Sequence, residues 1–223
     1  MAGLEIAILS VAEARTALEG GADSLEFLRD LAAGGLTPPL DELPAVRAAA
    51  PALTLHIMIR PHARDFVYTS AEMDDVLAAV ATAKAAGADG VVFGAHTLDG
   101  DLHLEQIAQV AAAAAPMTVT VHRALDSCRD PEGALRALVG VVGRIHTAGP
   151  APDAWAGREV VRRWRDAYQT HFRFVSSGGL TLERLPEFVA AAGVDEYHFG
   201  AAARTGGVVD VAKVRLLRQA LGK

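Results

Sequence analysis

The sequence predicts a (β/α)8 TIM barrel, and three features of the chain support this fold class. Short β-branched runs alternate with alanine-rich helical runs eight times within 223 residues. The connections are short and no linker interrupts them, so we expect residues 1–223 to form a single barrel domain. In six of the eight strand segments, ionisable residues alternate with large apolar ones. An open, doubly wound sheet is the alternative, but eight units in so short a chain favour closure.

The predicted strands have the alternation that separates the two faces of a sheet. They cover residues 4–9, 24–28, 54–60, 91–96, 118–123, 144–147, 173–178 and 196–200. Parallel strands buried on both faces usually read as continuous Val, Ile and Leu. Here apolar side chains such as Leu4, Ile6 and Ile8 suit a face covered by helices. The residues of the other parity then point inward, where each charge needs a partner. They are Glu5, Glu26, His56, Arg60, His122, His146, Glu196 and His198.

A helical run follows each strand, and several of these runs have recognisable ends. The predicted helices cover residues 10–20, 39–50, 70–86, 104–115, 131–142, 155–170, 181–192 and 209–221. Ser10 lies three residues before Glu13, which is the spacing of a capping box, and Ser70 and Thr181 offer similar N-caps. Gly193 follows a helix end, where a left-handed residue is favoured.

Composition excludes several classes of function. The chain is 51% hydrophobic with a net charge of −6, and it has no basic run, so a nucleic-acid partner is not expected. No apolar stretch is long enough to span a membrane, and the N-terminus does not read as a signal peptide. The one cysteine, Cys128, rules out an intrachain disulfide and fits a cytoplasmic protein.

In a (β/α)8 barrel the active face lies at the C-terminal ends of the strands. After the third strand, Arg60 has inward parity, and Asp65 and Tyr68 follow in a long loop. A buried arginine needs a carboxylate or an anionic ligand. Glu26 on the neighbouring strand is the expected partner, so Arg60 either forms a structural ion pair or contacts a ligand directly.

The fifth strand ends on a second polar group. His122 has inward parity, and Arg123 and Asp126 follow it closely. A histidine near a carboxylate can act as a base, a proton relay or a metal ligand. Small turns after the last two strands contain Gly178, Gly179 and Gly200. Such turns hold a phosphate group in many barrels, although tight turns also need glycine for steric reasons.

Other chemistries lack their motifs. The sequence has no P-loop, nucleophile-elbow or HExxH pattern, no GxGxxG and no CxxC. None of the three lysines lies in a predicted strand, so Schiff-base chemistry in the barrel is not expected.

Several of these motifs together resemble the CutC family of copper homeostasis proteins. The motifs are GGLTP, IRP with DF and Y, VFGA, HRA with D, and EYH, and their order extends along nearly the whole chain. The resemblance implies a cytoplasmic (β/α)8 barrel, usually a homo-oligomer such as a dimer or tetramer, with copper as a possible bound ion and no other cofactor. The matching positions are Glu5, Glu26, Arg60, Asp65, Tyr68, His122, Arg123, Asp126 and His198.

The chain departs from the family pattern where copper would need soft ligands. Ala7, Ile8 and Leu28 stand where family members often have cysteines. Cu(I) prefers thiolate and thioether ligands. Cys128 remains as a metal ligand together with His122, and Met58 has inward parity. The inward groups otherwise suit a polar or anionic molecule, or a harder ion.

Two functions of different classes therefore follow. By resemblance, the chain is a CutC-type copper homeostasis protein that binds copper. By residue chemistry, it is an enzyme or binder of a small anionic molecule. Arg60 and Arg123 would then hold the anion, His122 would transfer a proton and Asp126 would orient His122. Glu5 and Glu26 would act as acid/base groups or position Arg60, and His198 is a further candidate catalytic residue. A third reading is that the inward groups form only a structural network.

Overall fold

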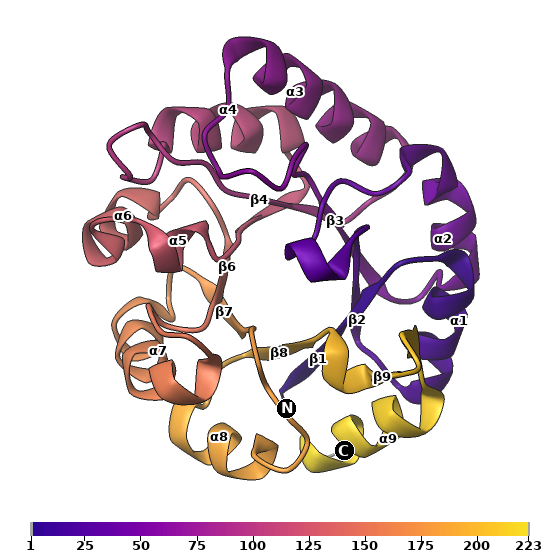
Figure 1. The fold of residues 1–223 in the computed structure, drawn as a ribbon. Helices are drawn as coiled ribbons and strands as arrows, with labels where there is room; N and C mark the ends of the chain where they lie inside the picture. Colours follow the sequence, from indigo (N-terminus) through magenta and orange to yellow (C-terminus); the bar gives the residue numbers. More distant parts are fainter. Residues whose placement is uncertain (1, 223) are drawn as a thin grey trace.

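A computed structural model describes residues 2–222 and shows a closed barrel of eight parallel strands (Figure 1). Each strand pairs with the next along the chain, and β8 closes the ring against β1. The closed pairing excludes the open doubly wound sheet. The strands are β1 Gly3–Ile8, β2 Ser24–Phe27, β3 Thr54–Met58, β4 Gly90–Phe93, β5 Thr118–Val121, β6 Arg144–Thr147, β7 Arg173–Ser176 and β8 Glu196–Phe199.

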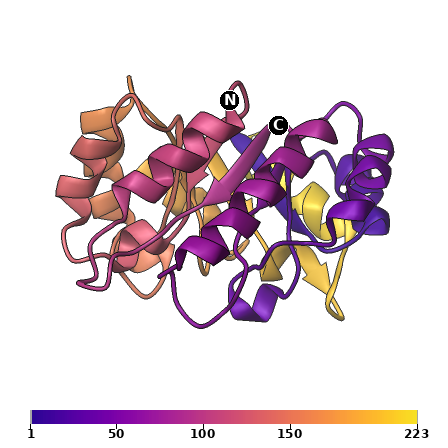
Figure 2. The same cartoon turned by 90° about the horizontal axis from the view of Figure 1, so that it is seen from above.

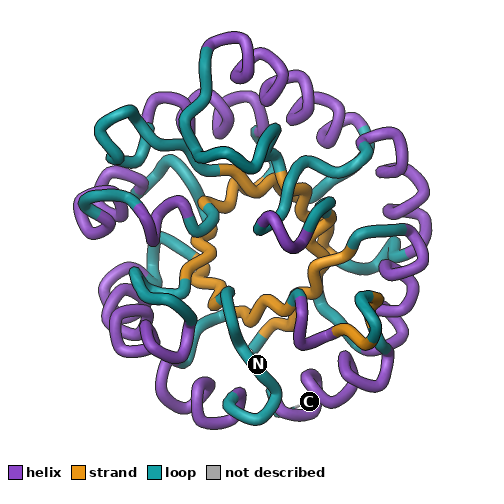
Figure 3. Tube along the Cα trace, in the orientation of Figure 1, coloured by secondary structure: helices purple, strands orange, loops and turns teal. Residues whose placement is uncertain are grey.

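Helices surround the strands, and Figure 3 shows the two concentric rings. The helices are α1 Val11–Gly20, α2 Leu43–Ala49, α3 Ser70–Ala85, α4 Leu104–Ala114, α5 Ala124–Ser127, α6 Pro131–Leu138, α7 Ala154–Tyr168, α8 Leu185–Ala192 and α9 Val211–Ala220. Neighbouring helices pack against each other, as α3 and α4 do, and Figure 2 shows the ring of helices from above. Within residues 2–222, no helix has the length and apolar character needed to cross a membrane.

The helix ends confirm some of the predicted caps and correct others. The Ser10 side chain accepts a hydrogen bond from the Glu13 backbone N–H, as predicted, and Gly193 ends α8 with a φ of +56°. Helix α3 is capped by Thr69 rather than Ser70, because Thr69 and Glu72 form a complete capping box. Helix α8 begins at Leu185 rather than near Thr181, with a proline in its first turn.

Short elements at the ends of the strands were not predicted. The 3-10 turn η1 (Leu31–Ala33) follows β2 and lies over the opening of the strand ring in Figures 1 and 3. Helix α5 follows β5 almost directly, and the two-stranded hairpin of β9 (Arg204–Thr205) and β10 (Val208–Val209) precedes α9. The turn η1 matters most for function, because it forms part of the mouth of the barrel.

The two faces of the sheet separate as the alternation predicts. Leu4, Ile6 and Ile8 belong to the large apolar layer between the strands and the helices. A second, small apolar cluster of Ala7, Leu28, Met58 and Val92 lies inside the ring. The rest of the barrel interior contains charged and polar side chains. A conventional apolar barrel core is therefore replaced by a polar centre.

Helix α7 contains the two tryptophans of the chain, and neither forms an exposed apolar surface. Trp164 is buried in the outer apolar layer. Trp155 is half-buried, and the guanidinium carbons of Arg158 and Arg184 lie 4.3 and 5.1 Å from its ring centroid. The two guanidinium groups therefore cover the Trp155 ring with charged groups.

Candidate functional site

Glu5 is the centre of a buried ionic network inside the barrel. Its side chain is fully buried, and four side chains contact its carboxylate. One oxygen lies 2.8 Å from His56 Nδ1 and 2.9 Å from Arg144 Nη2. The other lies 2.9 Å from His146 Nε2 and 3.0 Å from His198 Nδ1. Each of the two oxygens therefore has two partners, as a buried carboxylate requires.

The charges around Glu5 determine which groups ionise. Burial opposes its charge, but the Arg144 guanidinium and the hydrogen bonds from His146 and His198 outweigh this and hold the pKa of Glu5 well below its usual range. Burial lowers the pKa of His146 to about 4. Burial also opposes charge on His198, but Glu26 and Glu5 outweigh it and raise the pKa of His198.

Arg144 connects this network to the N-terminal end of the barrel. Its Nη2 lies 2.5 Å from Glu196 Oε2, and the other Glu196 oxygen lies 2.9 Å from Arg173 Nε. These groups line a polar cavity of about 270 Å³ at that end of the barrel. Arg144 was absent from the predicted site, although its parity matches that of His146. It stands at the start of its strand, whereas the predicted site was sought at the strand ends.

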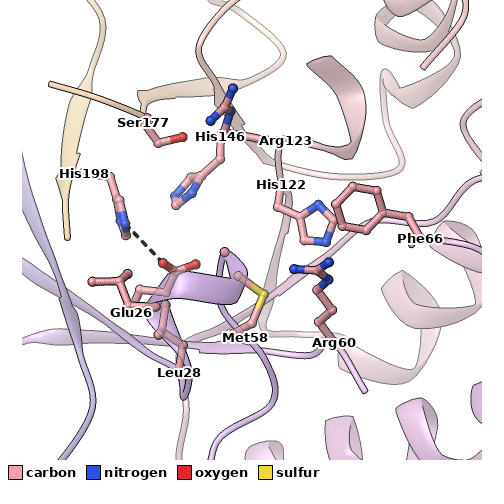
Figure 4. A pocket seen from close by; sticks show the side chains of 13 residues that line it. Glu26, Leu28, Met58, Arg60, Phe66, His122, Arg123, His146, Ser177 and His198 are labelled. Carbon is pink, nitrogen blue, oxygen red and sulfur yellow. Dashed lines mark ion pairs between the residues drawn. The ribbon is translucent and has the colours of Figure 1, made fainter. Parts of the chain in front are cut away.

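A second cavity, of about 190 Å³, opens at the C-terminal mouth of the barrel, and we call it the mouth cavity (Figure 4). Four of the predicted site residues, Glu26, Arg60, His122 and His198, line it directly. Glu5 lies beneath it and contacts His198. The other lining residues include Leu28, Leu31, Gly34, Met58, Phe66, Arg123, His146, Ser177 and Gly178.

Glu26 is held on one side of the mouth cavity. Its Oε2 lies 3.3 Å from His198 Nε2, the ion pair that is dashed in Figure 4. Its other oxygen, Oε1, is buried and has no hydrogen-bond partner within residues 2–222. Burial raises the pKa of Glu26 to about 7, and the nearby His198 only partly offsets this. The carboxyl group of Glu26 therefore exchanges its proton near neutral pH.

Arg60 does not pair with Glu26, which corrects the prediction. Its guanidinium donates to the backbone carbonyls of Ala33 at 2.8 Å and Gly35 at 3.3 Å. Arg60 lies two residues beyond Met58, the last residue of β3, so its side chain reaches the η1 segment rather than the level of Glu26. The guanidinium also packs 4.7 Å from the Phe66 ring centroid. Its Nε is buried without a partner among the described residues.

His122 is fixed by the backbone rather than by Asp126, and this too corrects the prediction. Its Nδ1 accepts a hydrogen bond of 3.1 Å from the backbone N–H of Ala124. The proton of the neutral ring must then lie on Nε2, which is buried and has no partner within residues 2–222. Burial and the Arg60 charge lower the pKa of His122 to about 3, so the ring is neutral.

Asp126 instead positions Arg123 and the end of β6. Its carboxylate lies 3.0 Å from Arg123 Nε and 2.8 Å from the backbone nitrogen of Ala148, and it also accepts from Thr147. Arg123 lines the mouth cavity as predicted for a ligand-binding residue. Asp126 therefore reaches the cavity only through Arg123.

The remaining predicted ligand residues divide between the cavity and its surroundings. Gly178 lines the mouth cavity, and together with Gly179 and Gly200 it lines an adjoining cavity of about 270 Å³. Asp65 is exposed and accepts from the Val67 backbone N–H, and Tyr68 packs in the outer apolar layer. Neither Asp65 nor Tyr68 lines the mouth cavity; of the loop after Arg60, the Phe66 side chain between them does.

The predicted metal ligands are not brought together. Cys128 lies in the outer apolar layer, where its thiol donates to the Leu125 carbonyl, so it cannot join His122 at the mouth cavity. Burial raises the pKa of this thiol, which disfavours the thiolate that a metal needs.

Another group, Glu5, His146 and His198, brings its donor atoms within 4.8 Å of one another. It does not fit a cation, because both Glu5 oxygens already have partners and Arg144 Nη1 lies 3.1 Å from His146 Nε2. A metal ion there would face a guanidinium at contact distance.

Comparisons with known proteins agree with this architecture. The model of the CutC family matches residues 2–203. A CutC family protein of Chromobacterium violaceum is 33% identical, with 99% of this chain and 98% of that protein covered. The human protein named copper homeostasis protein cutC homolog is 34% identical, with 89% and 72% covered. A solved CutC structure from Streptococcus agalactiae superposes with a TM-score of 0.83 at 22% identity, covers 90% of this chain and 98% of that one, and supports the barrel fold. The chain belongs to the CutC family.

Proposed function

We propose that this protein contributes to copper homeostasis, the process named for its human relative, by acting on a small anionic molecule held in the mouth cavity. One observation carries the proposal. Four buried polar atoms without partners among residues 2–222 belong to side chains that line this cavity: Arg60 Nε, His122 Nε2, Ser177 Oγ and Glu26 Oε1. Buried polar groups are nearly always hydrogen-bonded, so this set is suited to a polar ligand.

The charge of these groups favours an anion. Arg60 carries a full positive charge and bonds to neutral backbone carbonyls, with no carboxylate paired to it among the described residues. His122 and Ser177 add uncharged donors. A buried guanidinium is a strong, planar donor to carboxylate or phosphate oxygens. Arg123, which also lines the cavity, adds a second guanidinium.

Copper itself is a poorer ligand for this cavity. Met58 is the one thioether that lines it, and the one thiol of the chain lies in the outer layer. His122 presents an N–H rather than a lone pair, because its other nitrogen accepts from Ala124. Cu(I) sites use several soft or imidazole donors at once. We therefore propose a role in copper homeostasis that does not need copper in the cavity.

The test is a calorimetric titration at pH 7 with inorganic phosphate and hydroxypyruvate as anionic probes. We expect Arg60→Met to weaken binding of the bound probe by roughly 10- to 100-fold, which is the range for a hydrogen bond to a charged group. Arg64→Met is the matched control, since Arg64 lies in the same loop and its side chain is 66% exposed. Equal affinity in both variants would refute the proposal.

An anaerobic Cu(I) titration is the second arm of the same experiment. We expect no tight copper binding that depends on the cavity. Stoichiometric Cu(I) binding that is lost in Met58→Leu would overturn the proposal in favour of a copper site.

We also propose that the protein acts in the cytosol as a homo-oligomer. A lone, buried cysteine suits a reducing compartment. Light scattering after gel filtration tests the second part, and a monomeric mass at micromolar concentration would refute it.

A further inference from the structure

We infer that the mouth cavity is an active site in which Glu26 moves a proton between adjacent carbons of a small α-hydroxycarbonyl compound, with His122 and Arg60 polarising the carbonyl. This inference rests on the proposed function, since it needs a small anionic molecule in the same cavity. It adds a reaction class and a substrate class to it.

Glu26 has the geometry of a general base. Glu26 lines the cavity, and its Oε1 is buried without a partner among residues 2–222, while Oε2 forms an ion pair with His198. His198 is in turn hydrogen-bonded to Glu5 through Nδ1, so an ion pair and a hydrogen bond connect the Glu26 carboxylate to Glu5. Burial raises the pKa of Glu26 to about 7. A base is most effective when the pKa of its conjugate acid lies near the working pH.

His122 and Arg60 supply the opposite half of the reaction. Phe66 brings them together: its ring centroid lies 4.8 Å from that of His122 and 4.7 Å from the Arg60 guanidinium carbon. Figure 4 shows these three side chains across the cavity from the Glu26–His198 pair. His122 donates from Nε2 as a neutral ring, because Nδ1 accepts from the Ala124 backbone. A neutral imidazole N–H beside a cation can stabilise the oxygen of an enediolate.

The reaction balances without a cofactor. The Glu26 carboxylate takes the proton from the carbon that carries the hydroxyl group, and this C–H bond breaks. Its electron pair forms the carbon–carbon double bond of the enediolate, and the carbonyl π pair moves to the oxygen that His122 and Arg60 contact. Glu26 then returns the proton to the neighbouring carbon, and the hydroxyl proton moves to the former carbonyl oxygen. One carbon is oxidised and its neighbour reduced, so no external oxidant is needed.

The size of the cavity limits the substrate. Its volume of about 190 Å³ corresponds to roughly six water molecules at about 30 Å³ each. A compound of three or four carbons with one carboxylate or phosphate therefore fits best. A longer anionic end could enter the adjoining cavity, which shares Leu31, Gly178 and His198 with the mouth cavity.

The experiment is solvent deuterium exchange in the full-length protein, with hydroxypyruvate and dihydroxyacetone phosphate as probes. Proton NMR follows the loss of the signal from the carbon next to the carbonyl. We expect exchange into at least one probe, a fall of roughly 100-fold or more in Glu26→Gln, and an unchanged rate in Glu19→Gln, an exposed control. The rate should rise with pH through the titration of Glu26, which His198, Glu5 and Arg144 face.

The outcomes separate this inference from the proposed function. A probe that binds the wild-type protein without exchanging refutes the catalytic inference alone, whereas absence of both binding and exchange refutes both. If Glu26→Gln fails to fold, His122→Phe serves instead and should reduce exchange by at least about 10-fold. An exchange rate in Glu26→Gln equal to that of the wild type would assign Glu26 a structural role only.

Discussion

The replacement Glu5→Gln tests how much of the barrel depends on one buried charge. Glu5 is fully buried and its carboxylate contacts Arg144 at 2.9 Å together with three histidines. Removal of one partner of a buried ion pair leaves the other charge uncompensated, which costs about 3–5 kcal/mol. Arg144 keeps its contact with Glu196, so we expect the lower part of that range. For a chain of this length the loss corresponds to a fall in Tm of roughly 10 °C.

A matched control exists on the surface. Glu19 and Arg215 form an ion pair at the same N–O distance, 2.9 Å, but both side chains are more than half exposed. Glu19→Gln should therefore cost less than about 1 kcal/mol. Urea unfolding at pH 7, followed by circular dichroism, gives both free energies of unfolding. Equal losses in the two variants would refute the reasoning that burial makes the Glu5 network important.

The pH dependence provides a second check on Glu5. The folded state holds the pKa of Glu5 well below its ordinary value of 4.5, so its charge stabilises the fold above that pH. This stabilisation is lost as the pH falls through the lowered pKa. The difference between wild type and Glu5→Gln should therefore narrow below about pH 4.5. A difference that stays constant at acid pH would show that shape, rather than charge, causes the loss.

Three further predictions follow from individual contacts. The fold raises the pKa of Glu26 from 4.5 to about 7, so the protonated form of Glu26 stabilises the folded state. This stabilisation is lost as the pH rises from 4.5 through 7. Between pH 4.5 and pH 8 the free energy of unfolding of Glu26→Gln should therefore rise by up to about 3 kcal/mol relative to that of the wild type, measured by urea unfolding. An unchanged difference between the two proteins would contradict the raised pKa. In Gly94→Ala the new Cβ would lie 2.7 Å from two atoms of the His122 ring, so calorimetry should show probe binding at least about 10-fold weaker. Gly143→Ala, whose Cβ would meet its nearest atom at 3.5 Å, should bind as the wild type does. Cys128→Ala should leave probe and copper titrations unchanged and cost about 1 kcal/mol of stability, because the thiol packs in the outer layer. A changed titration would show that Cys128 takes part in binding.

The alternation along the strands was enough to predict which side chains face inward. Ile6 and Ile8 went to the helices and Glu5 to the interior, because a strand has a period of two residues. The same period cannot give the height of a side chain along the barrel axis. Glu26 and Arg60 have the same parity on adjacent strands, yet Glu26 pairs in register with His56 and Arg60 lies four residues further along. The predicted Glu26–Arg60 pair failed for this reason.

Contacts with loop backbone were also beyond the reach of the sequence. The partners of the Arg60 guanidinium are the carbonyl oxygens of Ala33, Gly35 and Ala63, and the partner of His122 Nδ1 is the N–H of Ala124. Nearly every residue has a backbone carbonyl and a backbone N–H, so the pattern of side chains does not predict which of them will be a partner. The HRALD motif predicted that Asp126 would orient His122, but the immediate start of α5 turns Asp126 toward Arg123.

The distribution of partners argues against a purely structural reading of the polar interior. A buried network that serves stability alone has every polar atom satisfied, since a half-satisfied network is worse than an apolar core. In the lower part of the barrel both Glu5 carboxylate oxygens have two partners each, and Arg144 Nε is the one atom of the Glu5–Arg144 pair without a partner among residues 2–222. In the upper part Glu26 Oε1, Arg60 Nε and His122 Nε2 all lack partners among the same residues, and their side chains line one cavity. The unpaired groups are therefore best explained by a ligand that completes their hydrogen bonds.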